Sequence, residues 1–240
     1  MPFRCLLTDP PLIAQLSAFA QENSFPDLYR AYSWRNDTYA NGFPDIYRLE
    51  SRLIRSDRTN GITLNDVKAV AEWGSMRNQG RIRGPAVVAP MNTLHTVAGT
   101  AVGTLATYPL VPLTLIQTHL KGIGPTYLSK VLRFALPQEY GAIDTRCVRV
   151  FGRGDPGAHR HDWLALHARN DGYGWYISKT QVHWPNEYEV WINILRHFAA
   201  VLPSNCPHPP AFAQGGLRQQ GTWECADLEM ALFSYASDHT

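Results

Sequence analysis

Cysteine is scarce in this sequence. Iron–sulfur clusters, zinc knuckles and disulfide frameworks need cysteines at close, regular spacing. The cysteines here form no CxxC pair and are scattered along the chain at Cys5, Cys147, Cys206 and Cys225. The sequence therefore argues against all three kinds of site, and it favours a reducing environment.

Long apolar runs are also lacking. No stretch approaches about 18 consecutive apolar residues, the length that a membrane-spanning helix needs. The N-terminal segment has Asp9 followed by two prolines where a secretory signal would need an unbroken apolar core. We therefore expect no membrane partner and a cytoplasmic location, associated with the nucleoid if the source is prokaryotic.

Charge is sparse as well. Charged residues make up 18% of the chain, and its formal net charge is +2. Any affinity for nucleic acid must therefore come from a local face rather than from the whole surface. Hydrophobic residues make up 45% of the 240 residues, enough for a large interior.

Apolar residues recur at helical spacing through much of the chain, so a mostly α fold is expected. The chain would form a single unit, 1–240, in which two lobes are anticipated, about 60–150 and 1–59 plus 151–240. A helix over 62–76 would be capped by Thr63 or Asn65. Further helices are expected over 91–105, 113–121, 125–136, 185–202 and 225–236, with a short strand over 174–178 and a long surface loop over the Pro/Gly-rich stretch 203–221.

A two-glycine turn separates the expected helices 113–121 and 125–136. Gly122 and Gly124 allow a tight turn, and Pro125 suits the first position of the second helix. The free N–H groups at the start of that helix form an anion site that fits a DNA phosphate. An ordinary turn between two antiparallel helices is the alternative.

The turn and the sequence after it resemble one superfamily. "LKGIG" is followed by "IDTRCVR", and Asp144 lies 18 residues after Thr126. This stretch, Leu120 to Arg149, resembles the helix-hairpin-helix DNA glycosylases, which include endonuclease III and the 8-oxoguanine glycosylases. The resemblance implies a mostly α bundle around a central hairpin, a double-stranded DNA partner with a modified base, base flipping, and a role in base excision repair. It implies no protein partner and no cofactor, apart from a monovalent cation that the hairpin could hold.

Asp144 is the expected catalytic residue. Breaking an N-glycosidic bond develops positive charge on the sugar, which a fixed carboxylate stabilises while it orients or deprotonates water. The alternative is that Asp144 only caps the next helix. Family members that also cut the strand carry a lysine where this chain has Thr126, so a monofunctional enzyme is expected.

Lys130 lies one helical turn after Thr126. It could contact the base, or it could act as a displaced lyase amine if burial lowers its pKa. A surface lysine is the alternative. Two other functions stay open: a non-catalytic DNA-binding module that keeps only the hairpin, and a bifunctional glycosylase and abasic-site lyase that uses Lys130.

A second stretch, "WGSMRNQGRI", is similar to the loop with which 8-oxoguanine glycosylases fill the gap left by the flipped base. The resemblance places Met76 as an apolar wedge and Asn78 and Arg81 as contacts to the orphaned partner base. It favours oxidised purines as substrates, with alkylated purines next. A solvated basic turn is the alternative.

The expected DNA face centres on the hairpin. Its contact residues would be Lys121, Gly122, Ile123, Gly124, Thr126, Met76, Asn78, Arg81 and Arg146. Residues 121–160 hold seven basic and three acidic side chains, a net charge of +4. The basic ones are Lys121, Lys130, Arg133, Arg146, Arg149, Arg153 and Arg160. Such a strip favours binding to the DNA backbone.

Other clusters carry weaker signals. His159, His161, Asp162 and His167 lie close in sequence, but no further ligand pattern accompanies them, so packing or surface roles are expected rather than a metal site. Possible stacking partners for a flipped base are Trp73, Trp175, Tyr176 and Trp184, and a place in the core is the alternative for each. Glu224, Asp227 and Glu229 are expected to serve the start of the last helix.

Overall fold

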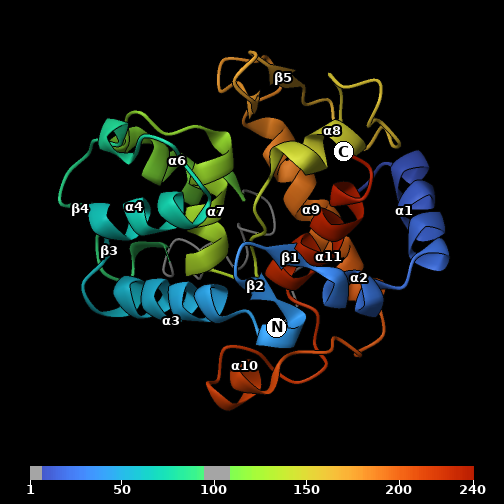
Figure 1. Ribbon diagram of the computed structural model, residues 1–240, viewed down its shortest axis with the longest axis horizontal. Coiled ribbons are helices and arrows are strands. Elements are labelled where there is room, and N and C mark those ends of the chain that lie inside the picture. Colours follow the sequence, from blue (N-terminus) through green and yellow to red (C-terminus); the bar gives the residue numbers. More distant parts are fainter. Residues whose placement is uncertain (1–6, 95–108) are drawn as a thin grey trace.

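The structure is a computed structural model that describes residues 7–94 and 109–240 (Figure 1). Most of the expected helix over 91–105 lies outside these residues. The helices are α1 (Pro10–Glu22), α2 (Phe25–Ala31), α3 (Pro44–Thr59), α4 (Leu64–Trp73), α6 (Leu110–His119), α7 (Pro125–Ala135), α8 (Thr145–Phe151), α9 (Asn186–Val201), α10 (Pro210–Gln214) and α11 (Cys225–Ser237), with short 3₁₀ turns η1 (Tyr39–Asn41) and η2 (Gln79–Arg81). The strands are β1 (Ser33–Trp34), β2 (Asp37–Thr38), β3 (Ile62–Thr63), β4 (Val87–Ala89), β5 (Ala168–Asn170) and β6 (Trp175–Ile177).

The fold is mostly α, as the periodicity predicts. Helices α3, α4, α6 and α7 gather on one side of the molecule, and α1, α2, α8, α9 and α11 on the other (Figure 1). The strands of the described residues form three antiparallel pairs: β1 with β2, β3 with β4, and β5 with β6. Helix α3 packs on α7, and α8 packs on α11. The division of the sequence into lobes by residue number stays a prediction.

Local sequence signals explain where the helices around the site begin. Thr63 and Asp66 form a reciprocal capping box at the start of α4, which selects Thr63 over Asn65 as the cap. Helix α7 starts at Pro125, whose ring suits the first helical position. Glu224 and Asp227 form a second capping box at the start of α11, which confirms their predicted place there.

Helix α9 fixes the chain that leads to Asp144. The Tyr188 hydroxyl donates to the carbonyl of Gly141 at 3.1 Å, and the Trp191 indole N–H donates to the carbonyl of Ala142 at 2.9 Å. Both donor side chains are fully buried. Two rigid aromatic side chains therefore hold this segment by its backbone, immediately before the residue that resembles the family aspartate.

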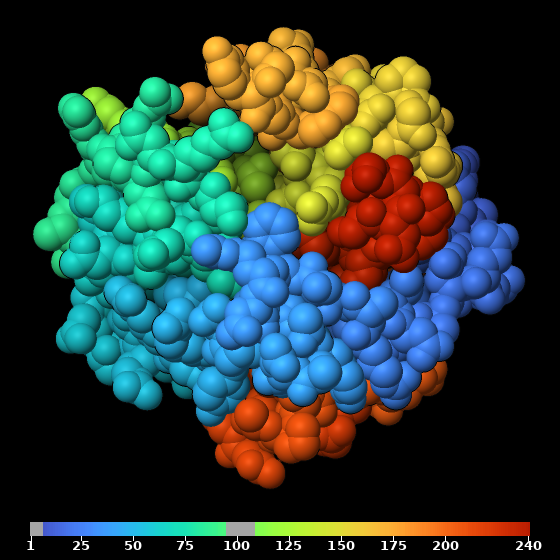
Figure 2. All heavy atoms as spheres, in the orientation of Figure 1, coloured from blue at the N-terminus to red at the C-terminus, as the bar shows by residue number. Residues whose placement is uncertain are grey.

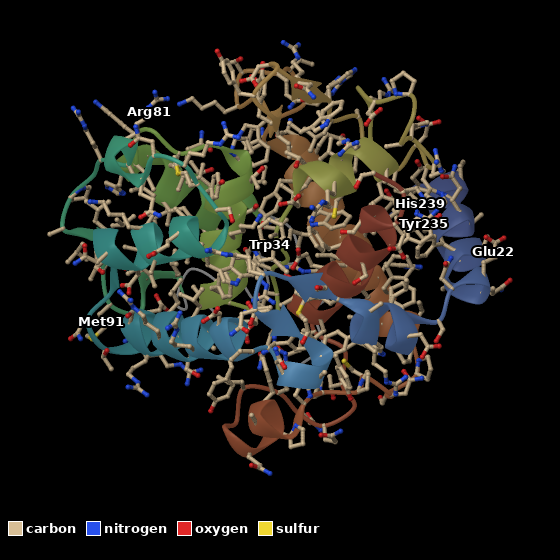
Figure 3. All side chains as sticks on the ribbon, in the orientation of Figure 1. Glu22, Trp34, Arg81, Met91, Tyr235 and His239 are labelled. Carbon is tan, nitrogen blue, oxygen red and sulfur yellow. The ribbon has the colours of Figure 1, made fainter. Side chains whose placement is uncertain are left out.

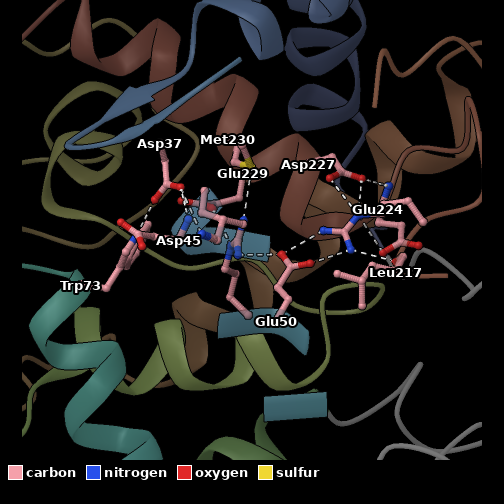
Figure 4. Close-up of polar contacts among 12 residues, drawn as sticks. Asp37, Asp45, Glu50, Trp73, Leu217, Glu224, Asp227, Glu229 and Met230 are labelled. Atoms are coloured by element: carbon pink, nitrogen blue, oxygen red, sulfur yellow. Dashed lines mark hydrogen bonds and ion pairs between the residues drawn. The ribbon is translucent and has the colours of Figure 1, made fainter. Parts of the chain in front are cut away.

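A buried ionic network joins the two groups of helices (Figure 4). Glu50 on α3 accepts from Arg133 on α7 at 2.7 Å and from Arg218 at 2.8 and 3.0 Å. Arg218 also binds Asp227 on α11 at 3.0 Å. Burying charges is costly unless each is paired. Arg133 therefore belongs to the interior, and its inclusion in the basic strip that would face DNA is wrong.

The stretch 203–221 is not simply a surface loop, which corrects the prediction from its composition. It contains α10, and it places the side chains of His208 and Arg218 in the interior, where both bind Asp227. Much of the stretch is exposed, as a surface loop would be, but the paired side chains of His208 and Arg218 anchor it in the interior. Among the described residues, no helix is both long and apolar enough to cross a membrane.

Candidate functional site

A pocket of about 390 Å³ opens between the two groups of helices. Figure 2 shows the face of the molecule hollowed between the teal segment that follows α4, the orange β5–β6 segment and the yellow-green α8, with green atoms of α7 at its floor. Its lining combines aromatic, basic and small residues. These are Trp34, Gly74, Met76, Gly124, Pro125, Thr126, Tyr127, Lys130, Asp144, Thr145, Arg146, Arg149, Trp175, Tyr176 and Ile177.

The two residues predicted to carry the chemistry meet in this pocket. Lys130 Nζ donates to Asp144 Oδ2 at 2.6 Å, and their side chains are 7% and 15% exposed. Lys130 extends from α7 and Asp144 stands at the start of α8. The alternative of a surface lysine is therefore wrong, because Lys130 is buried and reaches the predicted catalytic carboxylate.

Asp144 is also a helix cap. Its Oδ1 accepts from the Arg146 backbone N–H at 3.1 Å and from the Thr145 hydroxyl at 3.3 Å. The preceding backbone N–H, of Ile143, donates to Ser129 Oγ on α7 at 3.0 Å. One carboxylate oxygen thus fixes the orientation while the other faces Lys130, so the cap and the functional reading are compatible.

The ion pair favours the charged forms of both Lys130 and Asp144. Burial alone would lower the pKa of Lys130, but the adjacent Asp144 carboxylate outweighs it and raises that pKa. Burial alone would raise the pKa of Asp144, but Lys130 and the Arg146 backbone N–H lower it. The condition under which Lys130 would be a ready nucleophile, a pKa lowered by burial, is therefore not met.

Aromatic rings form the pocket walls. The Trp34 indole N–H donates to the carbonyl of Trp73 at 3.0 Å, and the Tyr127 hydroxyl donates to the carbonyl of Gly74 at 3.2 Å. These bonds occupy the polar tips of Trp34 and Tyr127. Trp175 lies 4.4 Å from the Arg149 guanidinium. The hydrogen bonds hold the Trp34 and Tyr127 rings in place, and the guanidinium of Arg149 lies over the ring of Trp175.

Arg146 is held at the pocket by aromatic contacts. Its guanidinium lies 5.3 Å from the Trp34 ring and 5.0 Å from the Phe233 ring. Within the described chain no carboxylate forms a salt bridge with it, whereas Arg149 binds Asp155 at 2.7 Å. Arg146 therefore presents hydrogen-bond donors at a fixed place beside Asp144.

The hairpin turn lies next to the pocket and against the "WGSMRNQGRI" loop. Lys121 and Arg83 exchange backbone hydrogen bonds of 2.8 and 3.0 Å. Gly122 has φ +75°, and a Cβ there would collide with the backbone carbonyl of Arg81. The structure thus brings together the two stretches that separately resemble glycosylase motifs.

Some of the remaining predicted contact residues line the pocket, and others lie outside it. Met76, Gly124, Thr126 and Arg146 line the pocket, while Asn78 and Arg81 are exposed and do not. Arg81 lies at the outer edge of its side of the molecule, away from the central Trp34 (Figure 3). In the turn, Lys121 and Gly122 are exposed, whereas Ile123 is 5% exposed and packs in the core. Burial therefore leaves Ile123 mainly its backbone for contact with DNA.

Two of the aromatic residues that line the pocket are not predicted from the sequence. Trp34 and Tyr127 line the walls, and no motif marks them. Trp175 and Tyr176, two of the candidate stacking residues, line the pocket, whereas Trp184 is buried beside Tyr188 and does not line it. An aromatic side chain in a turn-rich stretch such as that around Trp34 carries no signal of the pocket it will join.

The histidine cluster around residue 160 forms no metal site among the described residues, where the only group with suitable geometry is Cys206, His208 and Asp227. That group is an ionic cluster. Both Asp227 oxygens already accept from Arg218, and one accepts from His208. A bound cation would have to displace the Arg218 guanidinium from a buried carboxylate, so the donor set does not fit a metal.

Comparison with known proteins gives no match: no family model fits the chain, and no curated protein or solved structure is significantly similar to it. The likeness to helix-hairpin-helix glycosylases therefore rests on the sequence stretches Leu120 to Arg149 and Trp73 to Ile82 alone.

Proposed function

We propose that this chain is a DNA glycosylase that flips a modified base out of duplex DNA and hydrolyses its N-glycosidic bond. The observation that carries the proposal is the Lys130–Asp144 pair of 2.6 Å inside an aromatic pocket. The glycine turn that resembles the family hairpin lies directly beside that pocket. An ion pair suited to the reaction, a pocket with room for a base and a turn suited to a DNA phosphate thus lie next to one another.

Asp144 stabilises the sugar in this proposal. As the bond from the base to the sugar C1′ breaks, its electron pair leaves with the base and positive charge develops on the sugar. The Asp144 carboxylate, which stays ionised because its pKa is lowered, faces that charge and orients the water whose oxygen bonds to C1′. The proton lost by the water passes to Asp144 or to solvent.

Lys130 serves the departing base. The ammonium group stays protonated because its pKa is raised. A base that is uncharged in DNA leaves with the electron pair of the broken bond, and the ammonium group stabilises the negative charge that then develops on it. The base itself lies between aromatic walls such as Trp34 and Tyr127.

The charges of the pocket favour one class of base. Lys130 is paired with Asp144 and Arg149 with Asp155, so Arg146 is the pocket cation that forms no salt bridge among the described residues. Such a lining favours neutral bases with several carbonyl acceptors, such as oxidised purines. Alkylated purines that carry a positive charge on the ring would be repelled, so we place them second.

A second candidate function is abasic-site lyase action through Lys130. The distance of its amine from Asp144 favours this function, because an amine in the pocket is what a Schiff base with the sugar requires. Its raised pKa opposes this function, since an ammonium group has no lone pair for attack. We therefore rank hydrolysis first.

The test is a screen of duplexes that each carry one modified base, analysed with and without alkali. The proposal predicts base release from an oxidised-purine duplex, with strand breaks that appear only after alkali. Breaks without alkali would favour the lyase, and Asp144→Asn protein serves as the matched control. Binding without any base release across the panel would overturn the proposal and leave a DNA-binding module.

A further inference from the structure

A short hairpin stands at the rim of the pocket. Strands β5 and β6 pair Ala168 with Ile177, Arg169 with Tyr176 and Asn170 with Trp175. Ala168 and Ile177 are buried, so this face of the hairpin packs on the molecule. The alternate pair, Arg169 and Tyr176, is exposed, and Tyr176 lies at the pocket. Figure 1 shows β5 at the top of the molecule, and Figure 2 shows the same orange segment bordering the hollow.

The tip of this hairpin presents one aromatic ring. Tyr173 is 82% exposed. It lies between Gly172 and Gly174, where an added Cβ would meet no atom within 4 Å. The flanking glycines have no side chains, and the Tyr173 ring is largely exposed to solvent.

The tip is held in one shape by its own side chains. Asp171 Oδ1 accepts from the backbone N–H groups of Tyr173 at 3.0 Å and Gly174 at 3.1 Å. Asn170 Oδ1 accepts from the N–H of Gly172 at 2.8 Å, and Gly172 has φ +85°, which glycine adopts without strain. The exposed ring is thus presented by an ordered turn, so little conformational entropy is lost when it binds.

The hairpin carries unneutralised positive charge. Arg169 and Lys179 are exposed, and in the part of the chain that the structure describes neither forms a salt bridge. Asp171 directs one carboxylate oxygen to backbone N–H groups. The hairpin also continues into the pocket, because Trp175 and Tyr176 line it.

We propose that the β5–β6 hairpin is a second DNA contact, in which Tyr173 stacks on a base beside the nucleotide held in the pocket and Arg169 binds a backbone phosphate. An exposed aromatic ring, on a hairpin that also carries the exposed Arg169 and that lines a base-sized pocket, has the chemistry of a stacking contact with nucleic acid. This inference rests on the proposed function for its partner. The weaker fit is a protein surface, which has no regular array of phosphates to meet the exposed cations.

The test compares Tyr173→Ser with Tyr173→Trp and with the control Met91→Ser. Met91 is 54% exposed and lies at the left edge of the view, away from Trp34, which lines the pocket (Figure 3). Affinity is measured by fluorescence anisotropy on an unmodified duplex and on a duplex with one abasic site. Tyr173→Ser is expected to weaken binding to the abasic duplex roughly 5- to 100-fold, Tyr173→Trp to restore it, and Met91→Ser to leave it unchanged.

The phosphate contact has a separate signature. Arg169→Gln should lower the slope of log affinity against log salt by about one, whereas Tyr173→Ser should leave that slope unchanged. A Tyr173→Ser affinity within twofold of wild type overturns the inference and leaves the hairpin as a surface for a protein.

Failure of the proposed function has a different result. If no base is released but the Tyr173 effect persists, the glycosylase proposal fails and the hairpin contact stands. If base release occurs while Tyr173→Ser binds normally, only the hairpin contact fails. A wild-type protein that binds no duplex overturns both.

Discussion

Lys130 and Arg133 lie three residues apart on α7, and each binds a carboxylate that comes from another element. Lys130 meets Asp144 at the edge of an open pocket. Arg133 meets Glu50 in the interior, where Arg218 and Asp227 complete a closed set of partners. The two cations share a helix but differ in what else can reach them.

This difference assigns a structural role to the Glu50 network and a functional role to the Lys130–Asp144 pair. In the closed network every charged group has several protein partners, so its removal leaves another charge buried without compensation. In the open pair Asp144 remains 15% exposed and the pocket offers room for a ligand to approach it. We therefore expect mutations in the network to change stability, and mutations at the pair to change chemistry.

Breaking the closed network should give the largest effect on stability. Glu50→Ala removes the carboxylate that Arg133 and Arg218 share, and it should lower the free energy of unfolding by about 3–5 kcal/mol. Asp45→Ala is a matched control on the same helix, because Asp45 binds the exposed Arg48 and should cost less than about 1 kcal/mol. Urea denaturation measures both. Equal losses of unfolding free energy in the two variants would show that the network does not stabilise the fold more than an exposed ion pair does.

Adding a lysine in the first turn of α7 tests whether an amine in the pocket can cleave the DNA strand. Thr126→Lys places an amine where the glycosylase family carries its lyase lysine, and borohydride should then trap a covalent adduct with DNA. Wild type should give no adduct, because Lys130 is protonated. If wild type does form one, it should vanish in Lys130→Gln; an adduct that survives that change would point to another amine, with Lys121 or the N-terminus the next candidates.

Altering the turn beside the pair should have a smaller effect. A side chain at Gly124 would meet no protein atom within 4 Å, so Gly124→Val should fold normally. It would obstruct the approach of a phosphate, so duplex affinity should fall several-fold and its salt dependence should become shallower. Circular dichroism checks the fold. Unchanged affinity and slope would mean that the turn does not face DNA.

The smallest expected effect concerns Glu139, a largely buried carboxyl group that belongs neither to the ionic network nor to the Lys130–Asp144 pair. Burial raises the pKa of Glu139 to about 7, against the attraction of Arg196. A raised pKa means that the wild type loses stability as pH rises from about 4.5 to about 7. Glu139→Gln lacks this loss, so its stability relative to wild type should increase by on the order of 1 kcal/mol between pH 5 and pH 8. A difference that does not change with pH would contradict the shift.

Local signals made part of the site predictable. The capping position of Asp144, the start of α7 at Pro125 and the turn at Gly122 each depend on a few neighbouring residues, and the sequence pattern located them. The spacing between Thr126 and Asp144 spans one helix and a short segment, so it too could be recognised.

Long-range contacts were not predictable in the same way. Arg133 was assigned to a basic surface because its partner Glu50 lies 83 residues earlier in the chain. Arg218 lies in irregular structure, as its glycine- and proline-rich surroundings predict, but its burial depends on Glu50 and Asp227, which are distant in sequence or follow in the next helix. Trp34 joins the pocket from a distant segment that no periodicity marks. Pairing of distant charges and rings depends on tertiary packing, which a single sequence does not reveal.

The most direct test of the central claim is to measure base release and DNA affinity together for Asp144→Asn. The substitution keeps the shape of the side chain and removes the charge that faces the sugar. We expect duplex affinity to stay within a few-fold of wild type, while single-turnover release of the modified base falls by about 100-fold or more. Base release near the wild-type rate, with affinity unchanged, would show that Asp144 is only a helix cap and would contradict the proposed mechanism.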